Sequence, residues 1–171
     1  EETEAIGLSR LAPLGRLRAE RAWSSSADVS WKGSRTELNA TVFGSNIRHA
    51  LRLNAQQTFV NSTEPTRTAG SEFLARFRAS AMTFVLNYAY TRSAEQDIQL
   101  GGRRIAPLTP RHTAGFGAVW EQEQKGRMGF ESYYVGRQTL EENPYRALSK
   151  PYVLFGFLAE RRFGHWRLFV N

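Results

Sequence analysis

The sequence predicts an all-β protein, an antiparallel up-and-down transmembrane β-barrel with about eight strands in this chain. Three observations predict it: strand-length segments with a two-residue period, connections that alternate between short and long, and tryptophans beside the short connections. Residues 82–91 show the period best, because large apolar side chains alternate there with small or polar ones. The large apolar set is Met82, Phe84, Leu86, Tyr88 and Tyr90, and the small polar set is Thr83, Asn87, Ala89 and Thr91.

Composition excludes a helical membrane protein but leaves a barrel open. The 171 residues are 41% hydrophobic, the mean hydropathy is -0.47, and no run approaches the roughly 20 apolar residues of a spanning helix. A transmembrane strand needs about 9–11 residues, half of them polar, so mean hydropathy does not detect it. The absence of cysteine excludes a disulfide framework and a thiolate metal site.

The net charge of +7 favours a lipid surface over nucleic acid as the partner. Only three of the 23 basic residues are lysines, and the arginines are spread over turns, loops and strand ends instead of forming one stripe. Anionic lipid headgroups explain such a distribution at least as well as a nucleic acid does.

The first two expected strands are residues 24–31 and 37–47, joined by a short connection at 32–35. Val29 and Trp31 lie on one face of the first segment, with serine and aspartate on the other. The second segment alternates less regularly, but its length still suits a strand.

The third expected strand, residues 68–78, has phenylalanines on one face and Glu72, Arg76 and Arg78 on the other. Unpaired charges are costly in a dry core but ordinary in a watery barrel interior. A turn near Ser80 leads to the fourth strand, residues 82–91.

Residues 94–110 lose the alternation and contain two glycines and two prolines, which predicts a long loop. Strands five to seven follow at 112–121, 127–137 and 152–163, with a second long loop at 138–151. An eighth strand begins after the turn at Gly164. Strands six and seven carry the inward charges Glu131, Arg137, Glu160 and Arg162.

The connections predict the orientation of the barrel. Short ones fall at 32–35, near 80, at 122–126 and near 164, and the longer ones lie between them. Outer-membrane barrels have short periplasmic turns and longer extracellular loops. The short connections are flanked by Trp31, Trp120 and Trp166, which predicts an aromatic girdle at one membrane interface.

No set of residues predicts catalysis, a metal site or a cofactor site. The three histidines belong to different segments without metal-ligand spacing, and no serine or carboxylate group oriented by a histidine is evident. We therefore expect a protein that is not an enzyme.

The candidate site is instead the set of charges expected to face the barrel lumen. They either hold a plug or line a solute path, and the alternative is that they pair with each other in a filled lumen. The set is Glu72, Arg76, Arg78, Glu131, Arg137 and Glu160. The expected loop residues for ligand contact are Arg103, Arg104, Glu142 and Tyr145.

Several strings, in their order and spacing, resemble the late barrel strands of TonB-dependent outer-membrane receptors. Residues 17–22 lead into 26–29 and 40–45, and an asparagine-containing loop precedes a glycine-x-glutamate strand. The asparagine-containing loop is residues 60–62, and the glycine-x-glutamate strand begins at 68–72. A proline-rich entry to the next strand, residues 107–112, and two later segments, 134–138 and 160–164, complete the likeness.

The resemblance implies that residues 1–171 are part of a 22-stranded outer-membrane barrel, with the plug domain, the TonB box and the C-terminal strands absent from this chain. It implies import of a scarce ligand such as an iron-siderophore complex across the bacterial outer membrane. The expected partners are outer-membrane lipid and lipopolysaccharide, TonB acting through the plug, and a small ligand such as a metal chelate. No cofactor and no nucleic acid are expected.

Two alternatives remain open at this point. One is a complete eight-stranded outer-membrane barrel with an anchoring or adhesion role, which the length and strand count suit. The ending on Asn171 instead of an aromatic residue, and the polar inner face, speak against it. The other is a soluble basic β-sandwich that binds polysaccharide or nucleic acid, against which the tryptophan rim counts.

Overall fold

The computed structural model describes residues 16–56, 58–123, 125–141 and 143–171, and the long regular elements there are β-strands. Their bounds are β1 Arg21–Lys32, β2 Thr36–Arg48, β3 Leu51–Leu53, β4 Phe59–Asn61, β5 Thr66–Ala79, β6 Met82–Gln96, β7 Arg103–Ile105, β8 His112–Gln122, β9 Gly126–Val135, β10 Tyr152–Phe163 and β11 Trp166–Val170. Within these ranges, no helix has the length and apolar character needed to cross a membrane.

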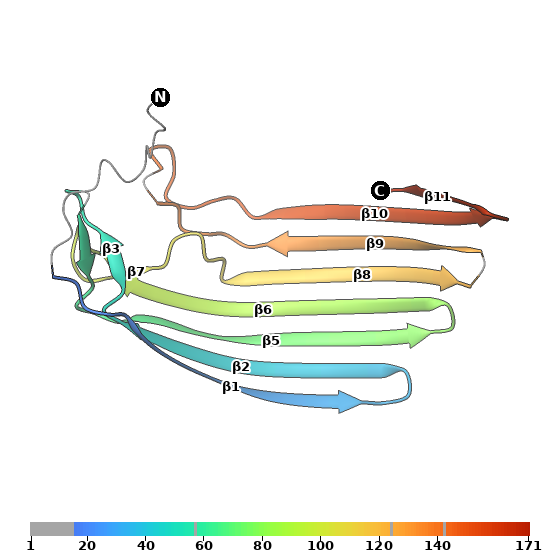
Figure 1. Ribbon diagram of the computed structural model, residues 1–171, viewed down its shortest axis with the longest axis horizontal. Coiled ribbons are helices and arrows are strands. Elements are labelled where there is room, and N and C mark those ends of the chain that lie inside the picture. The colour runs from blue at the N-terminus through green and yellow to red at the C-terminus, as the bar shows by residue number, and fades with distance from the viewer. Residues whose placement is uncertain (1–15, 57, 124, 142) are drawn as a thin grey trace, which may run out of the picture. The chain divides into compact units, whose positions relative to one another are not determined.

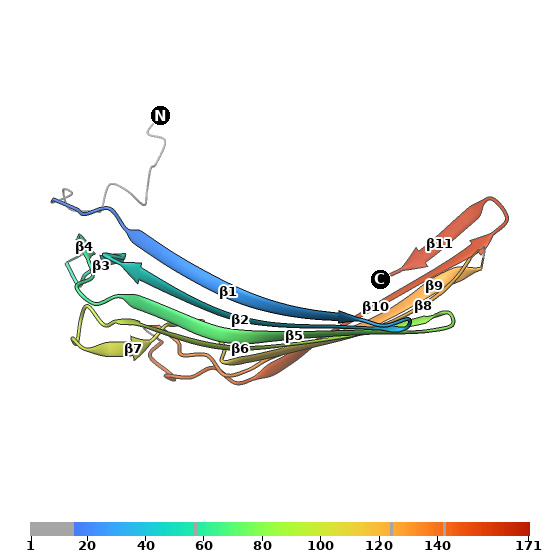
Figure 2. The ribbon, with the colours of Figure 1, turned by 90° about the horizontal axis from the view of Figure 1, so that it is seen from below.

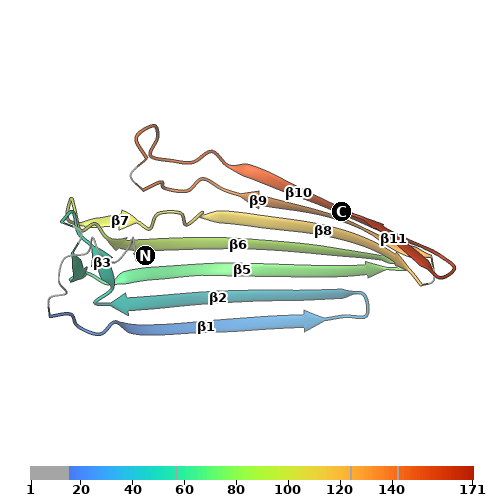
Figure 3. The ribbon, with the colours of Figure 1, turned by 45° about the horizontal axis from the view of Figure 1, so that its top comes forward.

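The main sheet follows the order of the chain. Its strands lie in the order β1-β2-β5-β6-β8-β9-β10-β11, and β7 pairs with the end of β6 (Figures 1 and 3). A separate two-stranded sheet consists of β3 and β4. All the described registers are antiparallel, so the main sheet is an up-and-down meander. The predicted all-β, antiparallel fold class is confirmed.

The chain divides into two compact units. The first contains the described residues up to Ser25 together with Gly44–Thr68 and Ser93–Ala106. The second contains Ser26–Phe43, Ala69–Arg92 and Pro107–Asn171. Strands β1, β2, β5 and β6 contribute residues to both units.

In the second unit the register separates two faces with different chemistry. Phe84, Ala118, Phe130 and Phe157 are successive partners across β6, β8, β9 and β10, so their side chains share one face. Here this is called the aromatic face. It comprises Met82, Phe84, Leu86, Tyr88 and Tyr90 of β6 and every residue in register with them on β8, β9, β10 and β11.

The opposite, polar face follows the partners Asn87, Gly115, Tyr133 and Leu154 across the same four strands. It also carries Glu131 and Glu160. The alternation predicted for these strands is therefore correct. Figure 2 shows the β10–β11 hairpin. The register continues the same alternation on β11 up to Val170.

The first unit contains secondary structure that the sequence did not predict. Strands β3 and β4 form a hairpin, and the N–H of Ser62 donates to the carbonyl of Ala50 at 2.8 Å. Each strand has three residues, which is too short for an alternation to be recognised in the sequence.

The expected long loop at 94–110 is partly wrong, because β6 continues to Gln96 and β7 pairs with it. The side chain of Asp97 accepts hydrogen bonds from the N–H groups of Gln99 and Leu100, both at 2.9 Å. Gly101 and Gly102 then adopt φ of 75° and 78°, a region that glycine tolerates. Together they reverse the chain and allow β7 to return along β6.

The sixth expected strand was too long at its C-terminal end. Strand β9 ends at Val135, so Arg137 lies two residues beyond it and does not hold a position in the strand alternation. Gly136 marks the exit, because its N–H donates to the carbonyl of His112 at 2.9 Å. A Cβ on Gly136 would lie 2.8 Å from that same oxygen, so the close approach requires glycine.

Candidate functional site

One cluster of charges on the polar face is centred on Glu160 of β10. Its carboxylate oxygens lie 3.1 Å from Arg127 Nε, 3.2 Å from Arg167 Nε and 3.8 Å from Arg162 Nε. The register explains the cluster, since Arg127 is the partner of Glu160 on β9, and Arg162 is the partner of Arg167 on β11. The Glu160 side chain is 7% exposed and the three arginines are about half exposed.

A second cluster of the same composition surrounds Glu37 of β2. Its carboxylate lies 3.3 Å from both Arg76 Nη1 and Arg78 Nη2 of β5, and 3.5 Å from Lys32 Nζ of β1. The N–H of Arg78 also donates to the carbonyl of Arg35 at 2.8 Å. Each cluster therefore holds one carboxylate against three cations and keeps a formal excess of two positive charges.

Sequence reasoning selected Arg76, Arg78 and Glu160 but missed Glu37, Lys32, Arg127 and Arg167. The sequence did contain a signal for the contact between Glu37 and Lys32, because these two residues flank a short turn between antiparallel strands. Arg127 and Arg167 become partners of Glu160 only through the register, which an isolated sequence does not fix.

Glycines on the polar face accommodate two polar side chains. A Cβ on Gly115 would lie 2.6 Å from Asn87 Nδ2, and one on Gly156 would lie 2.5 Å from Glu131 Oε1. The two side chains therefore lie over the bare backbone of neighbouring strands. Beside them is a hollow of about 450 Å³, lined among others by Tyr133 and Leu154.

Other polar side chains complete this face. Asp28 accepts hydrogen bonds from Asn39 Nδ2 at 2.7 Å and from Thr41 Oγ1 at 2.8 Å. Glu72 is exposed and lies on β5 at a position of the same parity as Arg76. The predicted charges Glu72 and Glu131 are thus strand residues, but they belong to neither of the two clusters described above.

The first unit contains a buried carboxylate held by two arginines. Glu95 of β6 is 3% exposed, and its oxygens lie 2.5 Å from Arg52 Nη2 of β3 and 2.8 Å from Arg104 Nη2 of β7. Arg52 also donates to the hydroxyl of Thr66 at 3.3 Å. The network ties β3 and β7 to the end of β6.

The expected loop contacts have different surroundings from each other. Arg103 and Arg104 are residues of β7 and not of a loop, because the turn after Asp97 returns the chain to β6. Arg104 forms an ion pair with Glu95, whereas Arg103 is exposed. Tyr145 is 91% exposed in the segment between β9 and β10, and its N–H donates to Asn143 Oδ1 at 3.0 Å. Glu142 lies outside the described residues.

The turn that precedes β7 carries a perturbed acid. Hydrogen bonds from the N–H groups of Leu100 and Gln99, with the nearby charge of Arg104, hold the pKa of Asp97 below its ordinary value. In the described ranges, no three His, Cys, Asp or Glu side chains come together in a way that suits a metal ion. The chemistry of both units is that of ion pairs and hydrogen bonds.

The comparison with protein families identifies the fold. The family model described as "TonB dependent receptor-like, beta-barrel" matches residues 7–171. The chain belongs to this family of TonB-dependent receptor-like β-barrels. The predicted family is confirmed. None of the curated proteins matches the sequence.

Solved structures of similar fold are described as an import receptor, an iron transporter and a siderophore receptor. The ferric-catecholate import receptor Fiu from E. coli K12 has a TM-score of 0.68 and 18% identity, over 91% of this chain and 24% of that one. The FrpB iron transporter from Neisseria meningitidis has a TM-score of 0.66 and 15% identity, over 85% of this chain and 25% of that one. The siderophore receptor PirA from Acinetobacter baumannii has a TM-score of 0.67 and 14% identity, over 87% of this chain and 26% of that one.

At these identities the likeness shows the shared fold. This TonB-dependent receptor-like chain spans about a quarter of the length of the three structures. Its strands correspond to a part of their architecture.

Proposed function

We propose that this chain is part of the barrel of a TonB-dependent outer-membrane receptor that imports a scarce ligand such as an iron-siderophore complex. Membership of the family supports the receptor assignment. The ligand class is supported by the similar structures, which are described as a ferric-catecholate receptor, an iron transporter and a siderophore receptor.

The observation that supports the membrane assignment is the concentration of large apolar side chains on the aromatic face, since side chains on both faces of this sheet are exposed, as Leu154 of the polar face shows. Phe155 is 73% exposed, and Phe157, Met128 and Phe130 also have large exposed surfaces. The buried hydrophobic residues in the described ranges are Ala50, Ala106 and Val135, none of which is large and aromatic. A water-soluble sheet would cover such a surface, whereas lipid acyl chains cover it in a transmembrane barrel.

In this proposal the polar face lines the lumen. Five of its members are the predicted residues Glu72, Arg76, Arg78, Glu131 and Glu160, whereas Arg137 follows the end of β9 and is proposed as a lumen residue from the sequence alone. The domain of residues 1–171 is then a partial barrel, and a plug in the parent protein receives energy from TonB. The short turns face the periplasm, and Arg103, Arg104, Glu142 and Tyr145 belong to the opposite, extracellular side.

We assign no catalytic role to this chain. A receptor moves its ligand without changing covalent bonds, and the polar face presents arginines and carboxylates already paired with each other. The transport role needs only a wet interior and a surface for lipid.

Uptake of radiolabelled iron tests the proposal. The gene for the receptor that contains this chain is deleted in its host and restored on a plasmid, and uptake is measured with ferric catecholate and ferric hydroxamate siderophores. The proposal expects uptake of at least one class to fall on deletion, to return with the gene, and to stay low in a strain without TonB. Unchanged uptake of both classes, together with unchanged growth on scarce metal, would contradict it.

A further inference from the structure

The aromatic face carries one cation near a short turn. Arg161 of β10 lies in register with Gly126 of β9 and Leu168 of β11, two residues beyond Ala159 on the same face. Its guanidinium carbon lies 5.0 Å from the ring centroid of Phe163, a cation–π arrangement. Among the described residues, no carboxylate oxygen lies within ion-pair distance of Arg161.

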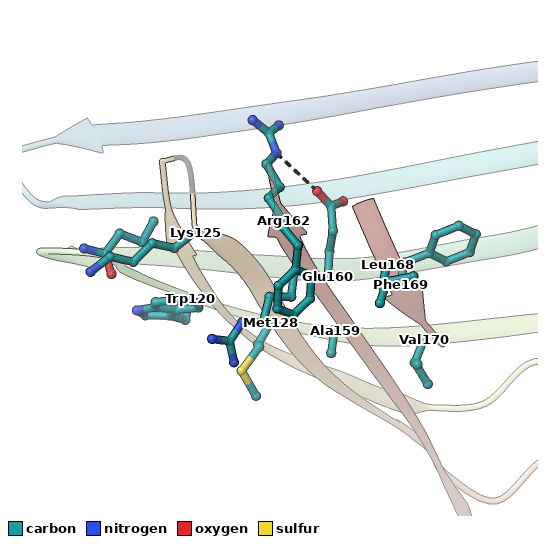
Figure 4. A pocket seen from close by; sticks show the side chains of 12 residues that line it. Trp120, Lys125, Met128, Ala159, Glu160, Arg162, Leu168, Phe169 and Val170 are labelled. Carbon is teal, nitrogen blue, oxygen red and sulfur yellow. Dashed lines mark ion pairs between the residues drawn. The ribbon is translucent and has the colours of Figure 1, made fainter. Parts of the chain in front are cut away.

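The nearest acid in sequence, Glu160, does not pair with Arg161. Glu160 lies on the polar face, where it is bound to three arginines. Figure 4 shows Arg162 and Glu160 joined by an ion pair on one side of β10, with Trp120 and Met128 on the other side. Arg161 is exposed and has no carboxylate partner among the described residues, so its guanidinium can bind an anionic group from outside the chain.

A hollow of about 590 Å³ includes Arg161 in its lining. Figure 4 shows this hollow with Trp120, Met128 and Leu168 among the labelled lining residues. Its apolar wall includes Trp120, Met128, Leu168 and Val170, and Lys125 lies at its edge. Ala159 lies in register between Met128 and Val170, and its single methyl group leaves the space between them open. The hollow thus combines an apolar wall with the cations of Lys125, Arg161 and Arg162, and the carboxylate of Glu160, which is paired with Arg162, also lines it.

Position along the strand explains why charge is tolerated here. Charge on the lipid face of a barrel costs about 2–4 kcal/mol at the bilayer midplane but about 0–1 kcal/mol near the interface. Arg161 is three residues from the turn residue Gly164. A headgroup phosphate lies at that depth and acyl chains lie deeper, in the direction of Met128 and Trp120.

We propose that this hollow binds one anionic phospholipid of the leaflet next to the short turns. Arg161 and Lys125 hold the headgroup phosphate, and an acyl chain lies against Trp120, Met128 and Leu168. The proposal rests on the proposed function, since a lipid reaches this face only if the sheet spans a membrane. Charge complementarity favours an anionic lipid over a zwitterionic one, because each basic residue near the surface contributes about fivefold in affinity for anionic lipid.

The test uses the full receptor that contains this chain, purified in a neutral detergent. Equal amounts of phosphatidylglycerol and phosphatidylcholine are added, and native mass spectrometry measures which lipid stays bound. The wild-type receptor is expected to retain phosphatidylglycerol at least about fivefold more than phosphatidylcholine. Arg161→Gln is expected to remove most of this preference, and Lys125→Gln to reduce it.

Arg127→Gln is the matched control, because it makes the same change on the opposite face and outside the hollow. It is expected to keep the preference for phosphatidylglycerol. The proposal is overturned if Arg161→Gln and Arg127→Gln retain the two lipids in the same ratio, or if the wild type binds both lipids equally.

A separate readout distinguishes failure of the lipid site from failure of the proposed function. Heat-modifiable migration on a gel reports whether the receptor is a folded barrel. A folded barrel without lipid preference overturns the lipid site alone. A receptor that is soluble and monomeric without detergent overturns the membrane assignment, and the lipid site with it.

Discussion

On the aromatic face of β6, β8, β9 and β10, large apolar side chains are exposed, and two phenylalanine pairs stack, with ring centroids 6.5 Å and 6.1 Å apart. On the polar face of the same strands, glycines lie beside amide and carboxylate side chains, and arginines surround Glu160. The backbone and its hydrogen bonds are common to both faces. Under the proposed function, this difference means that the side chains, and not the sheet, specify which surface meets lipid and which meets water.

The largest expected effect comes from placing a charge on the aromatic face. We predict that Phe84→Arg destabilises the folded receptor by about 2–4 kcal/mol, because the guanidinium is placed in the acyl-chain region. Asn87→Arg, on the polar face, is expected to cost far less, since the 450 Å³ hollow beside it accepts a longer side chain. Heat-modifiable migration and urea unfolding in vesicles measure both, and equal loss would contradict the assignment of the faces.

A glycine at a short turn gives the next largest effect. Gly126 has φ of 152°, and a Cβ there would meet the backbone carbonyl oxygen of Glu160. We predict that Gly126→Ala costs about 1–3 kcal/mol in the free energy of unfolding, because the oxygen belongs to backbone and cannot move aside easily.

Gly117→Ala is the control for this prediction, since its Cβ would lie 3.9 Å from its closest neighbour, an ordinary contact. It should change the free energy of unfolding by less than about 0.5 kcal/mol. If both variants unfold at the same urea concentration, the close approach at Gly126 is not what limits substitution.

The two charge clusters allow a smaller, graded comparison. We predict that Glu160→Gln costs about 1–2 kcal/mol, less than the ~3–5 kcal/mol of a fully buried pair because its arginines are half exposed. Glu37→Gln should cost about 0–1 kcal/mol, because Glu37 is 25% exposed against 7% for Glu160.

Salt should separate the causes of these losses. If repulsion among the arginines left behind drives the loss in Glu160→Gln, added salt restores part of the stability. A larger loss in Glu37→Gln than in Glu160→Gln would contradict the ranking by burial.

The smallest effect on stability is expected at exposed residues of the long-loop side. Tyr145→Ala and Arg103→Ala should change the free energy of unfolding by less than about 0.5 kcal/mol, because both side chains are exposed. If they contact the ligand, iron uptake falls although the barrel stays folded. Full uptake in both variants would remove them from the proposed contact set.

The long strands were predictable from the sequence, because large apolar side chains alternate with small or polar ones along them. Short strands and contacts that depend on strand register were not predictable. The alternation gave 152–163 for β10, and the structure has Tyr152–Phe163. Strands β3, β4 and β7 have three residues each, so no period is visible in them.

The candidate site was predictable only in part for the same reason. Arg76 and Arg78 could be assigned to one face from their spacing, but their contact with Glu37 depends on the pairing of β2 with β5. Arg104 was expected in a loop, because the turn formed by Asp97, Gly101 and Gly102 resembles a loop in composition. Register and turn geometry are tertiary information that alternation does not contain.

The most direct test of the two-face account compares neighbouring residues of β10. A single spin label is attached at position 155 or 154 through a cysteine substitution in the full receptor in vesicles, and its collisions with oxygen and with a water-soluble nickel chelate are measured. The account predicts that the label at Phe155 collides mainly with oxygen, which concentrates in lipid, and that the label at Leu154 collides more with nickel. Equal accessibility at the two positions, or the reverse order, would contradict the assignment of the aromatic face to lipid.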